Sequence, residues 1–164
     1  MHSPHQPPAT PPAGASAPLA STCSIQLRVR YSECDPLGVA HHASYAPWME
    51  MGRTELLRAS GVSDAKLEPE GVFLVIAKLE INYKRPIRYD DIVEVRTTWK
   101  GGGRVKIIHD YELWVIEHGG HAMGNIAATA ASPVPILCAT ASTLLACVDA
   151  KGALRALPDW LASV

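Results

Sequence analysis

The chain has 164 residues, a formal net charge of −1 and 19% charged residues. This length is sufficient for one domain with a sizeable hydrophobic core. The balanced charge and the lack of a long Lys/Arg block argue against a nucleic-acid partner and against a membrane-surface anchor.

Residues 1–22 differ in composition from the rest of the chain. They contain six of the 13 prolines, many alanines, and no Lys, Arg, Asp or Glu. Such a segment buries too little apolar surface to offset its ordering entropy, so we predict a disordered Pro/Ala-rich tail. It also lacks the basic start and apolar run of a signal peptide. Residues 23–164 are expected to form a single domain.

Residues 118–148 carry no Asp, Glu, Lys or Arg, which raises the question of a membrane span. Glycines and prolines interrupt the run, so the sequence argues against a transmembrane segment. The four cysteines, at positions 23, 34, 138 and 147, have no metal-ligand spacing. Without a secretory signal, they indicate reduced thiols in a cytoplasmic protein.

A strand and a turn are predicted at the start of the domain. Residues 25–31 alternate apolar and polar side chains, which is the pattern of a half-buried strand. The sequence Asp35-Pro36-Leu37-Gly38 then forms a turn that ends the strand.

A long helix is predicted next. Apolar residues recur at helical spacing from Tyr45 to Leu57, and Gly61 marks the C-terminal end. Because proline is tolerated only in the first turn of a helix, Pro47 places the expected start between Ala43 and Ala46.

The rest of the chain is predicted to be strands. They span residues 71–83, 92–99, 105–116 and 136–148, and Gly101-Gly102-Gly103 indicates a hairpin. Residues 117–135 read as a loop rich in Gly, Ala, Ser and Pro, and its length is unusual. The order of elements predicts an α+β domain in which one helix covers one face of a mainly antiparallel sheet.

The residues with the clearest chemistry surround the predicted turn. Asp35 precedes the helix, and His41 and His42 fall near its start. A carboxylate can act as a base or a nucleophile, and the N–H groups at a helix N-terminus can hold an oxyanion. Asp-Pro is also ordinary turn chemistry, so a purely structural role for Asp35 stays open. No Cys, Asp or Glu shows ligand spacing to the histidines, so no metal site is predicted.

The run R-Y-S-E-C-D-P-L-G-V-A-H-H-A-S-Y, followed by W-M-E-M-G-R-T-E-L-L-R, resembles the 4-hydroxybenzoyl-CoA thioesterase family. It looks closest to the acyl-CoA thioesterase branch associated with the Tol-Pal envelope system. The later run L-E-I-N-Y-K-R-P-I-R-Y-D-D-I-V-E-V is similar to a second segment of that family. The resemblance implies a hotdog fold, in which a curved antiparallel sheet of about five strands wraps one long helix. It also implies acyl-CoA substrates and a homodimer or homotetramer with active sites at the subunit interface.

The resemblance also implies site residues. Asp35 corresponds to the catalytic carboxylate, and the backbone N–H of His42 to the group that points at the thioester carbonyl. Whether the His42 side chain acts as well stays open. Tyr31 matches a tyrosine that some members place near the site, and Gly38 matches the glycine of the turn.

Two further sets of residues have alternative interpretations. Lys84, Arg85 and Arg88 either end in solvated loops or contact the phosphates of CoA. Glu50 lies three residues before Arg53, which indicates a helix-surface or interface ion pair. A second hotdog lineage uses a helix glutamate for catalysis, so Glu50 is the alternative carboxylate.

We therefore predict an acyl-CoA thioesterase that hydrolyses an acyl-CoA thioester to a carboxylic acid and free CoA. CoA is part of the substrate, and no metal or redox cofactor is expected. One alternative is a hotdog enoyl-thioester hydratase or dehydratase, which places an Asp and a His beside the same carbon. Another is a non-catalytic acyl-thioester-binding scaffold.

Overall fold

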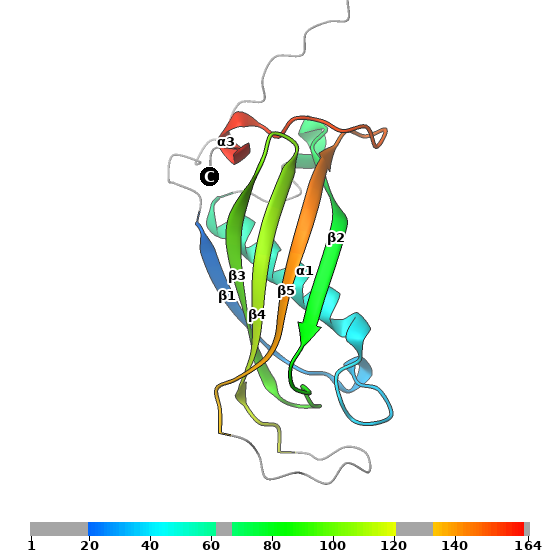
Figure 1. Cartoon of the computed structure of the whole chain (residues 1–164), viewed down its shortest axis with the longest axis vertical. Coiled ribbons are helices and arrows are strands. Elements are labelled where there is room, and N and C mark those ends of the chain that lie inside the picture. The colour runs from blue at the N-terminus through cyan, green and yellow to red at the C-terminus, as the bar shows by residue number, and fades with distance from the viewer. Residues whose placement is uncertain (1–19, 62–66, 121–132, 163–164) are drawn as a thin grey trace, which may run out of the picture.

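The computed structural model describes residues 20–61, 67–120 and 133–162. Most of the predicted tail and the middle of the predicted 117–135 loop lie outside these residues. The described part forms one long helix against a five-stranded sheet, as Figure 1 shows. The helices are α1 (His42–Ala59) and the short α3 (Asp159–Ala162). The strands are β1 (Thr22–Arg28), β2 (Phe73–Tyr83), β3 (Ile92–Gly103), β4 (Lys106–Glu117) and β5 (Ile136–Val148).

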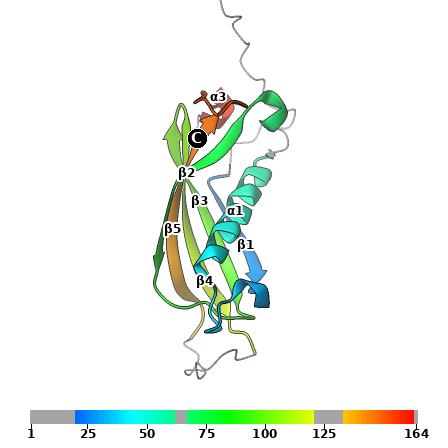
Figure 2. The ribbon, with the colours of Figure 1, turned by 90° about the vertical axis from the view of Figure 1, so that its right-hand side faces the viewer.

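The sheet has the strand order β1-β3-β4-β5-β2, and all neighbouring strands are antiparallel. The strands before and after the helix therefore lie at opposite edges of the sheet. In Figure 2 the sheet curves and α1 runs across its inner face. The predicted α+β architecture, with one helix on a mainly antiparallel sheet, is confirmed.

The apolar stripe of α1 forms the centre of the core. Tyr45, Trp48, Met49, Leu56 and Leu57 are all buried, as their helical spacing predicts. Trp48 is fully buried and is the largest such side chain in the described chain. The burial of this stripe fixes the helix on the sheet and thereby places its N-terminus beside the predicted Asp35 turn.

Gly52 allows the helix to lie close to the sheet. A Cβ atom at this position would overlap the hydroxyl of Thr97 and would lie 3.3 Å from a methyl group of Val95, both on β3. The small residue is therefore required by close approach rather than by backbone conformation.

Several predicted boundaries differ from the structure. Thr22, assigned to the tail, already pairs with Thr98, and the Ala20 N–H donates to the Ser60 hydroxyl, so residues 20–22 contact the folded part of the chain. Tyr31, assigned to the first strand, lies in a 3-10 turn, η1 (Tyr31–Glu33). Strand pairing and this local turn decide both ends, and neither can be read from side-chain alternation.

The other differences concern the helix start and the hairpin. Helix α1 begins at His42, one residue before the expected range, because His41 caps it. Pro47 consequently lies in the second turn. The three glycines end β3, and Arg104 and Val105 separate it from β4. The β3–β4 register shifts between Trp99 and Gly102, so the glycines form an irregular strand end rather than the turn itself.

Candidate active site

The Asp35 side chain organises the turn that precedes α1. Its Oδ1 accepts hydrogen bonds from the backbone N–H groups of Leu37, at 2.8 Å, and Val39, at 3.4 Å. The Asp35 carbonyl accepts from the N–H of Gly38, whose φ of 76° is a left-handed conformation that glycine adopts without strain. Among the described residues, Asp35 Oδ2 has no hydrogen-bond partner. The turn therefore orients the carboxylate and leaves one oxygen available for chemistry.

The start of α1 lies a few residues after this turn. His41 is the N-cap, and its Nδ1 accepts from the Ala43 N–H at 3.2 Å. His42 is the first helical residue, and its N–H is one of those that an α-helix leaves without an internal acceptor. The two imidazole rings are exposed and contact each other at an interplanar angle of 37°, with centroids 4.0 Å apart. The positive end of the helix dipole thus coincides with the predicted oxyanion position.

A second segment, residues 85–91, supports the turn from the other side. Val39 and Arg88 form an isolated antiparallel bridge, and the Ala40 N–H donates to the Ile87 carbonyl at 2.8 Å. The ring of Tyr31 meets that of Tyr89 edge-on at 5.9 Å. The fold therefore brings the segment that contains Arg88 next to the Asp35 turn.

Glu33 is the residue of the site that the sequence reasoning missed. Its side chain is 9% exposed. Oε1 accepts from Trp48 Nε1 at 3.0 Å and from Arg30 Nη2 at 2.6 Å, and Oε2 accepts from the Arg30 N–H at 2.8 Å. The Glu33 carbonyl accepts from the His41 N–H and the Ser44 hydroxyl. Glu33 therefore fastens the loop before Asp35 to the first two turns of α1.

The environment of Glu33 keeps it ionised. Burial alone would raise the pKa of its carboxyl group, but the hydrogen bonds from Arg30 and Trp48 outweigh that effect and hold the pKa below its usual 4.5. The only sequence indication was the Arg30–Glu33 spacing of three residues. Its partner Trp48 is 15 positions away, and only the folded chain brings the two together.

We expect Glu33→Ala to destabilise the protein by about 2 kcal/mol, because it leaves the buried Trp48 N–H without an acceptor. Urea unfolding measures this free energy. Glu112→Ala is the matched control, since Glu112 also accepts from an indole N–H, that of Trp114, but on the exposed surface. Equal losses of unfolding free energy in the two variants would show that the buried Glu33–Trp48 hydrogen bond contributes no more than an exposed one.

The Glu33 network also predicts a pH dependence of stability. The folded-state pKa of Glu33 is lower than its unfolded value, so the stabilisation from its ionised carboxylate is fully present above about pH 4.5. That contribution is lost as the pH falls from 4.5 through the lower folded pKa. Glu33→Gln should therefore unfold with a weaker pH dependence than the wild type in this acidic range.

The other predicted site residues are less close to the turn. Glu50 is eight residues into α1, about 12 Å along the helix from His42, and its carboxylate pairs with Arg53 at 3.3 Å. Lys84 and Arg85 follow β2 with exposed side chains. The backbone N–H groups of both donate to the Cys138 carbonyl. Among the described residues, no group of three or more His, Cys, Asp or Glu side chains could hold a metal ion.

The site geometry can be compared with known proteins. The family model described as the Thioesterase-like superfamily matches residues 29–164. The chain belongs to this superfamily. A putative acyl-CoA thioesterase of Bacillus subtilis, YneP, is 31% identical over 140 residues, which cover 82% of the chain and 89% of YneP. The acyl-CoA thioester hydrolase YbgC of Escherichia coli is 41% identical over 71 residues, 43% of the chain and 53% of YbgC.

Solved structures of other thioesterases share the fold. A DHNA-CoA thioesterase from Staphylococcus aureus is 26% identical with a TM-score of 0.70, and the match covers 85% of each chain. The 4-hydroxybenzoyl-CoA thioesterase from Pseudomonas is 18% identical with a TM-score of 0.67, and the match covers 85% of this chain and 94% of that one. The second likeness concerns the fold alone. The predicted hotdog fold is confirmed. None of the described helices is long and apolar enough to cross a membrane.

Proposed function

We propose that this superfamily member is an acyl-CoA thioesterase, which hydrolyses an acyl-CoA to a carboxylic acid and free CoA. The observation that carries the proposal is the Asp35 carboxylate, held by its own turn a few residues before the N-terminus of α1. The relationship to YneP and YbgC supports the acyl-CoA substrate class. No metal or redox cofactor has a role in this proposal, since CoA is part of the substrate.

The proposed mechanism uses two groups. Asp35 either takes a proton from water as the water adds to the thioester carbon, or adds to that carbon itself. In both cases the carbonyl oxygen gains negative charge, which the His42 N–H and the positive end of α1 stabilise. The C–S bond then breaks and CoA leaves as the thiolate. If Asp35 adds directly, water hydrolyses the resulting anhydride in a second step.

The segment that follows β2 is the proposed CoA-binding region. Lys84 and Arg85 have exposed side chains, and Arg88 is bridged through its backbone to the Asp35 turn. These cations suit the phosphates of CoA, which arginine binds in a bidentate manner. Tyr31, 69% exposed beside the same turn, is proposed to border the thioester.

A free-thiol release assay with short, long and aromatic acyl-CoAs tests the proposed function. We expect release of CoA thiol from at least one of them. Hydration of an enoyl-CoA without thiol release would instead favour the hydratase alternative. Tight acyl-CoA binding without any turnover would favour the scaffold alternative.

We also propose a homodimer or homotetramer, because β2 is an edge strand with an uncovered apolar surface. Ile76, Leu79 and Tyr83 are 45%, 40% and 53% exposed. The two charged residues of β2, Lys78 and Glu80, pair with each other. An apolar edge is normally covered, because it otherwise pairs with other chains. A second copy of the chain is the proposed cover. We also propose that the protein is cytoplasmic. We propose that it belongs to the Tol-Pal-associated branch, because it contains the run R-Y-S-E-C-D-P-L-G-V-A-H-H-A-S-Y.

We expect Leu79→Lys to shift the assembly to monomer and to remove most of the activity. Sedimentation velocity measures the first effect, and thiol release the second. Leu154→Lys is the control, since Leu154 is 71% exposed but lies outside all strands. A wild-type monomer with full specific activity on dilution would contradict the proposed interface site.

A further inference from the structure

Asp91 is a buried carboxylate to which the proposed reaction gives no role. It directly precedes β3, and its side chain is 4% exposed. Oδ2 accepts from the Arg88 N–H at 2.8 Å, and Oδ1 accepts from the Gly119 N–H at 2.9 Å. His118 Nδ1 lies 3.5 Å from the same Oδ1. The carboxylate therefore joins the turn before β3 to the chain that leaves β4.

The turn that Asp91 closes is held by contacts on several sides. The Asp91 N–H donates to the Arg88 carbonyl at 3.3 Å, and the Asp91 carbonyl accepts from the Val29 N–H at 2.9 Å. Asp90 has a φ of 68°, a conformation that residues other than glycine rarely adopt. Arg28 donates to the Asp90 carbonyl at 2.9 Å and to its Oδ1 at 3.0 Å. A strained conformation persists where surrounding contacts hold it, so these bonds set the position of the turn.

The same segment contacts the Asp35 turn through its backbone. Residues 87–89 run antiparallel to residues 38–40 and exchange hydrogen bonds with them. Val39, in the middle of that stretch, donates its N–H to Asp35 Oδ1 at 3.4 Å. Two residues later, His41 caps α1. A shift of residues 87–89 would therefore move the Asp35 carboxylate relative to the N–H groups at the start of the helix.

We propose that Asp91 is a positioning residue, which sets the place of the Asp35 carboxylate relative to the His42 N–H by fixing residues 87–89. This role rests on the proposed function, in which Asp35 and the His42 N–H act on the same thioester carbonyl. Asp91 is buried and does not contact the substrate. A misplacement of about 1 Å that starts far from the chemistry can lower the rate about 10²-fold, so a residue of this kind has a measurable effect.

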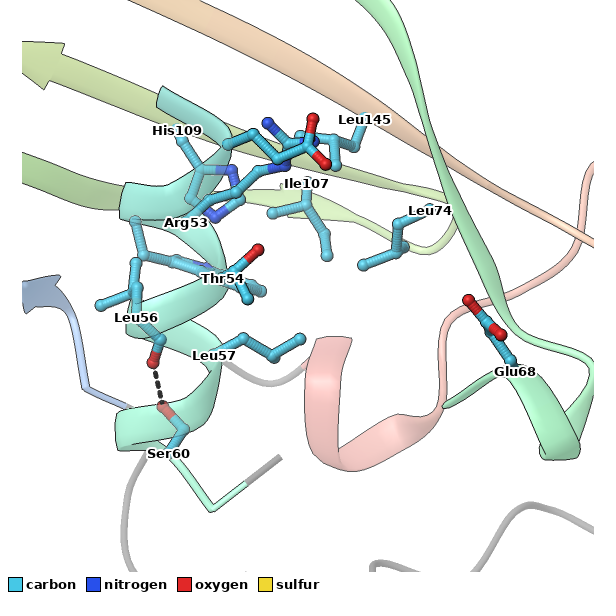
Figure 3. A pocket seen from close by; sticks show the side chains of 12 residues that line it. Arg53, Thr54, Leu56, Leu57, Ser60, Glu68, Leu74, Ile107, His109 and Leu145 are labelled. Atoms are coloured by element: carbon cyan, nitrogen blue, oxygen red, sulfur yellow. Dashed lines mark hydrogen bonds and ion pairs between the residues drawn. The ribbon is translucent and has the colours of Figure 1, made fainter. Parts of the chain in front are cut away.

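The alternative carboxylate, Glu50, lies outside this arrangement. Glu50 borders a pocket beneath the C-terminal half of α1, which Figure 3 shows between Arg53 of the helix and Leu74 of β2. None of residues 85–91, all of which the structure describes, lines this pocket. Catalysis by Glu50 would therefore not depend on Asp91, so substitution of Asp91 also distinguishes between the two carboxylates.

Thiol-release kinetics of Asp91→Asn test the proposal, with an acyl-CoA and with the matching acyl-pantetheine thioester, which lacks the phosphates of CoA. Only the oxygen of the asparagine amide can accept, so the N–H of Arg88 or of Gly119 loses its acceptor. We expect kcat to fall about tenfold to 10²-fold for both substrates, with KM changed less than about threefold, because the displaced groups act on the thioester. An unchanged kcat would overturn the proposal, and a raised KM for the acyl-CoA alone would then assign Asp91 to the binding of its phosphates.

Arg155→Gln is the matched control for a loss of stability. Arg155 Nη1 donates to the carbonyls of Glu70 and Gly71, both at 2.7 Å, and so also joins distant segments. It lies beside the β3–β4 hairpin, at the end of the sheet opposite Asp91. Both variants should unfold at a lower temperature than the wild type, but Arg155→Gln should keep its kcat. Equal losses of kcat in the two variants would overturn the proposal.

Amide hydrogen exchange provides a measurement that does not need turnover. The Ala40 N–H, which donates to the Ile87 carbonyl at 2.8 Å, should exchange about tenfold faster in Asp91→Asn than in Arg155→Gln, each measured equally far below its unfolding temperature. Equal exchange rates would overturn the proposal whether or not any acyl-CoA is hydrolysed. Faster exchange, with no thiol release by the wild type, would support the placement of the turn by Asp91 and refute the thioesterase activity. Asp91→Ser is measured alongside, so that poor folding of one variant does not decide the outcome.

Discussion

Replacement of Asp35 by Asn should lower kcat for the best acyl-CoA substrate by about 10²–10⁴-fold, because it removes a base or nucleophile. Folding should be unaffected. The Asn side-chain oxygen can still accept from the Leu37 and Val39 N–H groups that Asp35 Oδ1 binds. Thiol-release kinetics measure kcat, and thermal unfolding verifies that the variant is folded.

Asp149→Asn is the matched control for this variant. Asp149 Oδ1 also accepts from two backbone N–H groups, those of Lys151 and Ala153, in a turn after β5. If Asp35 only forms a turn, the two variants should behave alike and both should remain active. Glu50→Gln completes the set. Retention of activity within threefold in Asp35→Asn, together with a large loss in Glu50→Gln, would transfer the catalytic role to the helix carboxylate.

The largest expected loss of stability follows from substitution of Gly52. Gly52→Leu should destabilise the protein by on the order of 3 kcal/mol, because the new side chain must displace Thr97 and Val95 of β3. Urea unfolding measures this loss. Ala59→Leu, on the exposed side of the same helix, should change stability by less than about 0.5 kcal/mol.

A double-mutant cycle tests the steric explanation. Gly52→Ala brings a methyl group against the Thr97 hydroxyl, so the same substitution in a Thr97→Ala background should cost less. Equal costs in the two backgrounds would show that the helix shifts as a body and that the contact with Thr97 does not limit it.

The sequence by itself determined the elements and the centre of the candidate site. Alternation and helical spacing are local properties of the chain, so they identified the helix and the strands that follow it with small errors at the ends. The Asp35 turn is equally local, because its hydrogen bonds span at most four residues. The family resemblance rested on the run around Asp35 and on a second run, residues 79–95, and it supported both the fold and the proposed reaction.

The tertiary structure decided what depends on contacts between distant residues. His109 lies on the inward face of β4 in the same alternation as Ile107 and Tyr111, yet a polar residue in an apolar pattern does not reveal the pocket beneath α1. The sequence indicated no buried role for Glu33, which lies between the first strand and the Asp35 turn. Its burial depends on its contact with Trp48, 15 positions away. The strand order that leaves β2 at an edge, and the bridge between Val39 and Arg88, likewise arise only on folding. Periodicity tells which way a side chain points from its own element, whereas the partner it meets is set by packing of elements far apart in the chain.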